Sequence, residues 1–195
     1  MSELQYNSGF GNEFATEAVE NTLPEGQNTP QKVNHGLYAE QLTGSPFTMP
    51  RAQNKRSWLY RIRPSVVHEP FKPLKSGHLK STPFDEVPPS PNQMRWDPLE
   101  LPTTETDFID GLITVAGGGD AHSWAGLGIH VYAANKSMKL SQRYFYNADG
   151  ELLFVPESGS VFIRTEMGCL DASPGEIIVI PRGIKFAVDF PQGSS

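Results

Sequence analysis

The sequence predicts a mainly β protein, a jelly roll or β-sandwich with an extended Pro-rich arm at its N-terminal end. Three observations predict this class. Short apolar segments recur at roughly 8–12-residue intervals in the second part of the chain, as in sandwiches and barrels. Turn-forming residues separate these segments, and no long helical period interrupts them. The chain has 195 residues, enough for one domain with a core and an arm.

Residues 1–107 are rich in Pro, Gly and Asn and are expected to form the extended arm. One clear strand is expected near 56–63, with Trp58, Tyr60 and Ile62 on one face. The prolines that follow exclude long helices and central strands. Because the segment contains too many aromatic residues for a solvated linker, we expect the arm to cover its own domain or a neighbouring subunit.

Residues 108–195 are expected to form the strand-rich part of the same N-terminal β-domain. The predicted strands are 108–116, 128–134, 142–146, 151–155, 161–166, 176–180 and 185–190. Turns are predicted at 117–120, 147–150, 158–159 and 173–175. The last strand runs directly into the final residues, so we expect the sheet to be incomplete at its C-terminal end.

Charge and composition exclude several classes of partner. The formal net charge of −6 disfavours a general binder of nucleic acid or anionic membranes. The first residues lack the features of a secretory signal, and no apolar run is long enough for a membrane span. Cys169 is the single cysteine, which excludes an internal disulfide and fits a reducing compartment. We expect a cytoplasmic protein with no nucleic-acid and no membrane partner.

A basic cluster between Arg51 and Arg63 stands out in this acidic chain. Its arginines suit a carboxylate-bearing substrate or an acidic partner surface. A solvated strand face and a contact between subunits are the other interpretations, and the sequence leaves the role open. The cluster consists of Arg51, Lys55, Arg56, Arg61 and Arg63.

The segment 174–186 resembles the second cupin motif, in which Pro-x-Gly-x-x-His follows a strand and the histidine binds a metal. Pro181 and Gly183 keep the pattern, but Phe186 occupies the histidine position, and a phenyl ring has no lone pair for a metal. In the region of the first motif, Glu151 is approximately kept, whereas aromatic residues at 144–146 replace the paired histidines. We therefore expect a metal-free cupin-like domain. We assign no catalytic, cofactor-binding or metal-ligating residue to this chain.

The histidines match no compact metal motif. One alternative would bring Asp120, His122 and His130 together with Glu151 across a hairpin. Histidines at the surface or hydrogen-bonded in the core are the simpler interpretation. The five histidines are His35, His68, His78, His122 and His130.

Two further motifs suggest chemistry at first sight. The glycine run at 117–119 lacks the Gly-Lys-Ser/Thr of a phosphate-binding loop, so we interpret it as a turn. Cys169 would need a nearby base to act as a nucleophile, and its surroundings in sequence favour packing at a hairpin.

Long collinear blocks of the chain resemble homogentisate 1,2-dioxygenase. They are very specific, because they follow in order and in register over essentially all 195 residues. The matching blocks are 6–14, 23–28, 36–48, 54–65, 84–87, 91–96, 128–132 and 145–151.

The resemblance implies a mononuclear Fe(II) enzyme of phenylalanine and tyrosine catabolism. Such an enzyme uses O₂ to open the ring of homogentisate, giving maleylacetoacetate. In that family an N-terminal β-domain precedes a C-terminal cupin domain that carries the iron ligands, two histidines and a glutamate, and the subunits form trimers and hexamers. This chain would then be the N-terminal scaffold and oligomerisation part, with no iron bound to it and no activity by itself.

The alternative is a non-catalytic, metal-free cupin that binds a small ligand or serves as a structural or oligomer subunit. A gene model cut short, a splice product, an expressed fragment and a short natural protein all agree with the sequence. The coding DNA after Ser195 would separate the enzyme from this alternative, because a second barrel with a His/Glu/His set would favour the enzyme.

Overall fold

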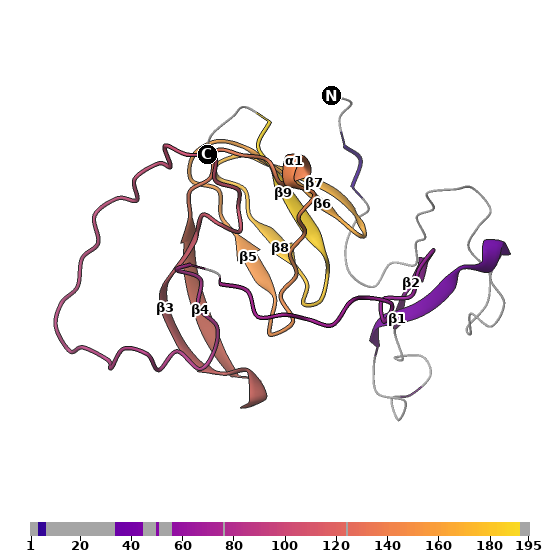
Figure 1. The fold of residues 1–195 in the computed structure, drawn as a ribbon, viewed down its shortest axis with the longest axis horizontal. Coiled ribbons are helices and arrows are strands. Elements are labelled where there is room, and N and C mark those ends of the chain that lie inside the picture. Colours follow the sequence, from indigo (N-terminus) through magenta and orange to yellow (C-terminus); the bar gives the residue numbers. More distant parts are fainter. Residues whose placement is uncertain are drawn as a thin grey trace. The chain divides into compact units, whose positions relative to one another are not determined.

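The computed structural model describes residues 4–6, 34–44, 50, 56–75, 77–123 and 125–191. Contacts divide the chain into two compact units (Figure 1). The N-terminal unit is Gln5–Pro73, and the C-terminal unit comprises Met1–Leu4 with Leu74–Ser195. The change of sequence pattern at residue 107 therefore lies inside the second unit.

The N-terminal unit contains an antiparallel hairpin. β1 (Tyr38–Gly44) pairs with β2 (Arg56–Arg61), and the short 3-10 turn η1 (Asn34–Gly36) precedes β1. The strand expected near 56–63 is present as β2. Its partner β1 is not among the predicted strands, because a single sequence shows alternation but not pairing.

The described residues of the C-terminal unit form three antiparallel sheets, with strand orders β3-β4, β5-β8 and β7-β6-β9 (Figure 1). The prediction of a mainly β fold is confirmed. Its elements are β3 (Leu112–Asp120), η3 (Ala121–Ser123), β4 (Ala125–Tyr132), α1 (Met138–Ser141), β5 (Leu152–Phe154), β6 (Val161–Thr165), β7 (Gly168–Ala172), β8 (Ile178–Ile180) and β9 (Phe186–Asp189).

The core lies between the β5-β8 sheet and the β7-β6-β9 sheet. Alternate residues of each strand point inward, as the period of two requires. Phe154 of β5 and Phe186 of β9 contact each other with ring centroids 5.6 Å apart, and Phe108 joins them at 5.2 and 6.1 Å. The other buried apolar residues of these strands include Val161, Ile163, Val188, Ile178 and Ile180.

α1 closes one side of this core. Met138 is fully buried, and its Sδ accepts a hydrogen bond of 3.3 Å from the backbone N–H of Val188 in β9. The N–H of Lys139 donates to Asp189 Oδ1 at 2.9 Å. These contacts explain how so short a helix persists, because tertiary packing supplies the stability that its own hydrogen bonds do not.

The strand predicted at 142–146 is wrong. Gln142 adopts a left-handed conformation, with φ 51°, that ends α1. Only Phe145 then forms a bridge, to Phe186, with backbone hydrogen bonds of 2.9 and 2.8 Å. A helix termination of this kind usually uses glycine, so the sequence gives no warning of it.

The turn predicted at 117–120 is also wrong, because these residues belong to β3. The actual connection is η3, where Asp120 accepts a hydrogen bond of 2.9 Å from the N–H of His122. Gly119 faces Gly126 across the hairpin, and a Cβ on Gly119 would lie 2.4 Å from the carbonyl oxygen of Ala125. The glycines therefore permit two strands to approach closely. A glycine run in the sequence is compatible with this arrangement as well as with a turn.

One other predicted boundary shifts, and one strand that was not predicted is present. Residues 108–111 form a turn, so β3 begins at Leu112 instead of residue 108. β7 follows β6 through a tight turn and adds a strand that is not among those predicted. The turns predicted at 147–150, 158–159 and 173–175 are confirmed as bends or turns. Within the described ranges, no helix has the length and apolar character needed to cross a membrane.

Candidate functional site

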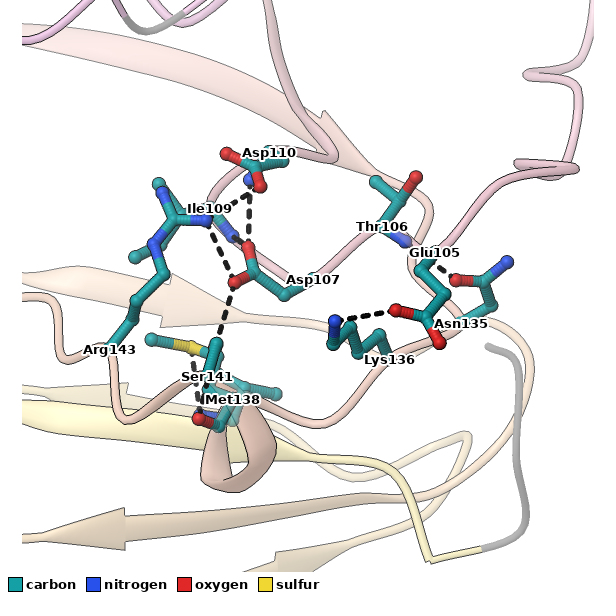
Figure 2. Close-up of polar contacts among 11 residues, drawn as sticks. Glu105, Thr106, Asp107, Ile109, Asp110, Asn135, Lys136, Met138, Ser141 and Arg143 are labelled. Atoms are coloured by element: carbon teal, nitrogen blue, oxygen red, sulfur yellow. Dashed lines mark hydrogen bonds and ion pairs between the residues drawn. The ribbon is translucent and has the colours of Figure 1, made fainter.

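Among the described residues of the C-terminal unit, a well-connected polar group is centred on Asp107, which is 3% exposed. Its Oδ1 accepts hydrogen bonds from the N–H groups of Ile109 (3.0 Å) and Asp110 (3.1 Å). Its Oδ2 accepts from Ser141 Oγ (3.3 Å) and from Arg143 Nη1 (2.9 Å) (Figure 2). We call Asp107, Asp110, Ser141 and Arg143 the polar joint, because they connect the turn before β3 to the end of α1.

Arg143 completes the joint by pairing with both aspartates. Its Nη1 lies 2.6 Å from Asp110 Oδ2 and 2.9 Å from Asp107 Oδ2. The hydrogen bond to Asp110 is the largest cause of a raised pKa of Arg143, and the charge of Asp107 adds to it. The guanidinium therefore stays cationic and balances the buried carboxylate, which would otherwise be costly to bury.

A second group connects the segment before Asp107 to the end of β4. The side-chain amide of Asn135 donates to the carbonyls of Pro102 (3.0 Å) and Thr104 (2.9 Å) and accepts from the N–H of Thr106 at 2.8 Å. Beside it, Lys136 Nζ pairs with Glu105 at 2.6 Å (Figure 2). Asn135 thus satisfies three backbone groups at once.

The polar joint is suited to holding elements together. A carboxylate offers about four acceptor sites, and Asp107 receives four donors. Little acceptor capacity remains for a metal ion or for a proton in transfer. The arrangement therefore indicates a structural role, because the buried charge, its counter-charge and its hydrogen bonds all come from this chain.

Phe186, at the histidine position of the cupin pattern, lies in the core and is 1% exposed. In the region of the first motif, Phe145 packs against Phe186 with ring centroids 5.6 Å apart. Tyr144 is exposed, and Lys185 Nζ lies 5.7 Å from the ring centroid of Tyr146. The aromatic residues at both motif positions therefore contribute packing and surface contacts.

The structure does not gather Asp120, His122, His130 and Glu151 into a metal site. Across the ranges that the structure describes, no three His, Cys, Asp or Glu side chains are placed to hold a metal ion. His130 Nδ1 instead lies 3.0 Å from Thr114 Oγ1, and burial lowers the pKa of His130. Glu151 pairs with Arg182 at 3.4 Å.

The remaining histidines lie in separate places. His35 is part of η1 and has a φ of 60°. His68 Nδ1 is 2.7 Å from the carbonyl oxygen of Glu69, and its ring stacks on Phe71 at 4.5 Å. His78 is exposed, and its carbonyl accepts a hydrogen bond of 3.1 Å from the N–H of Thr114.

Part of the basic cluster is engaged in the N-terminal hairpin. Arg61 Nε pairs with Glu40 Oε2 at 2.9 Å, and Glu40 Oε1 accepts a hydrogen bond from the N–H of Ser65. That backbone hydrogen bond is the largest cause of a lowered pKa of Glu40. Arg63 is exposed. Arg51 and Lys55 lie outside the described residues, as does the side chain of Arg56.

Cys169 lies on β7, exposed, with its backbone opposite Arg164 of β6. The expected hairpin is present, but the exposed side chain of Cys169 does not provide the packing that was expected there.

The sequence analysis predicted neither the polar joint nor the hydrogen bonds of the Asn135 side chain. Asp107 precedes a predicted strand, which is a weak sign of a capping carboxylate. The pairing with Arg143 spans 36 residues and leaves no pattern in a single sequence.

Comparison with known protein families gives one finding. The family model described as homogentisate 1,2-dioxygenase N-terminal matches residues 5–195.

Proposed function

Because the chain belongs to the homogentisate 1,2-dioxygenase N-terminal family, we propose that it is the scaffold and oligomerisation part of a cytoplasmic enzyme that opens homogentisate. In the proposed reaction, O₂ cleaves the aromatic ring of homogentisate and gives maleylacetoacetate. The family match over residues 5–195 is the observation that carries this proposal. Homo-oligomers, trimers or hexamers, are part of it.

The side chains described in this chain do not fit an iron site. Fe(II) dioxygenases of the facial-triad type need two histidines and a carboxylate that converge on one point with open positions beside them. At the corresponding position Phe186 fills the core, and Asp107 is saturated by donors of its own chain. We therefore derive no step of ring opening from these residues and assign iron binding to another part of the enzyme.

The contacts of the C-terminal unit support a scaffold role. Aromatic packing between β5 and β9 fills its core. The polar joint connects the turn before β3 to α1, and its carboxylate is used by donors of this chain instead of by a metal ion. A domain with these properties can position other parts of an enzyme, because rigid elements place a site more accurately than loops do.

The test measures O₂ uptake with homogentisate after loading with Fe(II). The chain by itself should bind no stoichiometric iron and consume no O₂ above a buffer control with the same free iron. Co-production with a chain that carries the iron-binding domain of the family should give a complex with higher activity than that domain alone.

Activity from the chain by itself would overturn the scaffold assignment. The scaffold assignment would also be contradicted if co-production gave no complex or no increase in activity. An Ile163→Ala variant serves as the control for the integrity of the fold, because its buried side chain belongs to the core and should be required for the gain.

A further inference from the structure

Ser90 lies in an exposed segment, residues 87–101, that contains no helix or strand (Figure 1). Every residue of this segment is exposed. The Ser90 hydroxyl accepts a hydrogen bond of 3.2 Å from the N–H of Asn92, and among the described residues this is its single hydrogen-bond partner. The hydroxyl group therefore meets solvent, and its own hydrogen is free for another acceptor.

The neighbours of Ser90 keep its backbone extended. Pro88 and Pro89 precede the serine and Pro91 follows it, so the φ angles on both sides are fixed near about −65°. A residue before proline is disfavoured in the helical region, which restricts Ser90 itself to extended conformations. The sequence thus favours a solvated polyproline II conformation. An enzyme that binds this serine in an extended groove loses little free energy in ordering it.

We propose that Ser90 is a phosphorylation site for a proline-directed serine/threonine kinase, with ATP as the phosphate donor. Kinases of this class bind an extended substrate in which proline directly follows the phosphorylated residue. Proline suits that position because it has no backbone N–H that would need a partner. Pro91 stands at this position, and the exposed, extended backbone of residues 88–91 gives the kinase access.

The transfer joins Ser90 Oγ to the γ-phosphorus of Mg·ATP. A bond forms between these two atoms, and the bond from the γ-phosphorus to the oxygen that bridges to the β-phosphate breaks, so ADP leaves. The catalytic aspartate of the kinase accepts the Oγ proton. The new phosphate carries a charge of about −1.5 to −2 at pH 7 and is a strong acceptor, so it can keep the hydrogen bond from the N–H of Asn92.

Thr82-Pro83 has the same dipeptide pattern, but the fold holds it in place. Thr82 is half-buried, and its Oγ1 accepts a hydrogen bond of 3.3 Å from the N–H of Ala121. Two residues further on, Phe84 packs on the β3-β4 hairpin, where a Cβ on Gly117 would lie 2.5 Å from its ring. A kinase can bind this threonine only after these contacts have opened, which costs free energy.

Ser173-Pro174 is exposed but lies in a turn. The N–H of Ser173 donates to Glu176 Oε2 at 2.8 Å, and the carbonyl of Ser173 accepts the N–H of Glu176 at 3.0 Å. Its hydroxyl shares a hydrogen bond of 3.0 Å with that of Ser160. Extending the chain at this serine would break these hydrogen bonds. Of the Ser-Pro and Thr-Pro pairs within the described ranges, Ser90-Pro91 is therefore the one that is both exposed and extended.

The test is phosphorylation of the full chain by a mitogen-activated protein kinase, which is proline-directed, followed by site-resolved mass spectrometry. The initial rate at Ser90 should exceed the rates at Thr82 and Ser173 by about tenfold or more, because those two sites must first open. Thr29 and Ser45 also precede prolines but lie outside the described residues, so their phosphorylation is measured separately.

Pro91→Ala tests the class of kinase. This variant keeps the Ser90 hydroxyl but removes the proline after it, and phosphorylation of Ser90 should fall to the rate of Thr82 in the wild-type chain. Pro98→Ala is the matched control, because Pro98 is an exposed proline of the same segment that follows an aspartate. It should keep the wild-type rate at Ser90. An unchanged rate in Pro91→Ala would overturn the assignment to a proline-directed kinase.

Two synthetic peptides separate the effect of the fold from that of the sequence. Peptides of residues 76–87 and 86–97 present Thr82 and Ser90 without the hairpin, so the excess of the Ser90 rate over the Thr82 rate should be smaller than in the full chain. An equal excess in peptides and chain would refute the structural basis of the proposal. Absence of phosphate on Ser90 in the full chain would overturn the site itself, as would equal rates at Ser90, Thr82 and Ser173.

Discussion

The two sheets that enclose the core differ on the faces that point away from it. On the outer face of β6 and β9, Arg164 Nε pairs with Asp189 Oδ2 at 2.7 Å, and the same aspartate caps the start of α1 through Lys139. On the outer face of β5 and β8, Leu153 and Val179 stand opposite each other and are 63% and 55% exposed. The outer face of β6 and β9 therefore carries paired polar groups, whereas the outer face of β5 and β8 carries exposed aliphatic side chains.

The difference shows that alternation alone does not decide how a strand is used. In β6, Val161 and Ile163 are buried whereas Phe162 and Arg164 are partly exposed, as expected when one face is buried and the other meets water. The continuous apolar run 177–180 is typical of strands covered on both faces, yet Ile177 and Val179 are exposed while Ile178 and Ile180 are buried. The inward faces of both sheets are equivalent, and only their outer faces differ.

The largest expected effect separates inner from outer positions. Ile163→Ala removes a fully buried side chain of β6 and should lower the free energy of unfolding by about 2–5 kcal/mol. Leu153→Ala removes a similar side chain from the exposed face of β5 and should change it by only about 0.5 kcal/mol. Denaturant unfolding of both variants measures the contrast. Similar losses at the two positions would remove the distinction between the faces.

An intermediate effect is expected on the polar outer face. Asp189→Asn weakens the contacts to Arg164 and Lys139 together and should cost about 1–3 kcal/mol of unfolding free energy. Arg164→Ala alone should cost less, because Arg164 is more exposed than Asp189. A double-mutant cycle gives the coupling between the two residues, and additive effects would show that the ion pair does not stabilise this face.

The smallest expected effect concerns the aliphatic outer face. The double variant Leu153→Thr, Val179→Thr places β-branched residues at both positions and should alter the unfolding free energy by no more than about 0.5 kcal/mol per position. Its solubility should rise and its binding of a hydrophobic dye should fall, since exposed aliphatic surface is removed. A loss of unfolding free energy as large as that of Ile163→Ala would mean that this face is covered in solution.

The sequence predicted the parts of this fold that depend on local pattern. The alternation in Val161 and Ile163 placed β6, and the Pro-x-Gly turn placed Phe186 at the start of the last strand. The blocks of resemblance led to the family that the comparison confirms. These features can be predicted because each depends on residues that are close together in the sequence.

The features that could not be predicted depend on distant partners or on unusual backbone. Nothing in the sequence connects Asp107 with Arg143, and the Thr114–His130 contact exists only once the β3-β4 register is fixed. Gln142 ends α1 in a conformation that glycine normally adopts. Gly119 allows close contact between two strands, whereas glycine more often forms a turn.

The hydrogen bonds of the Asn135 side chain have a consequence for proteolytic cleavage of the chain. The exposed segment 87–101 belongs to the C-terminal unit and is attached near both ends, by Phe84, which lies against Gly117, and by Asn135, which donates to the carbonyls of Pro102 and Thr104. Exposed, extended segments are preferred sites of proteolysis. A single cut within this segment would leave β1 and β2 on one piece and β3 to β9 on the other, so the two pieces would be held together by contacts such as those of Thr82 and Phe84 with the β3-β4 hairpin and its connection.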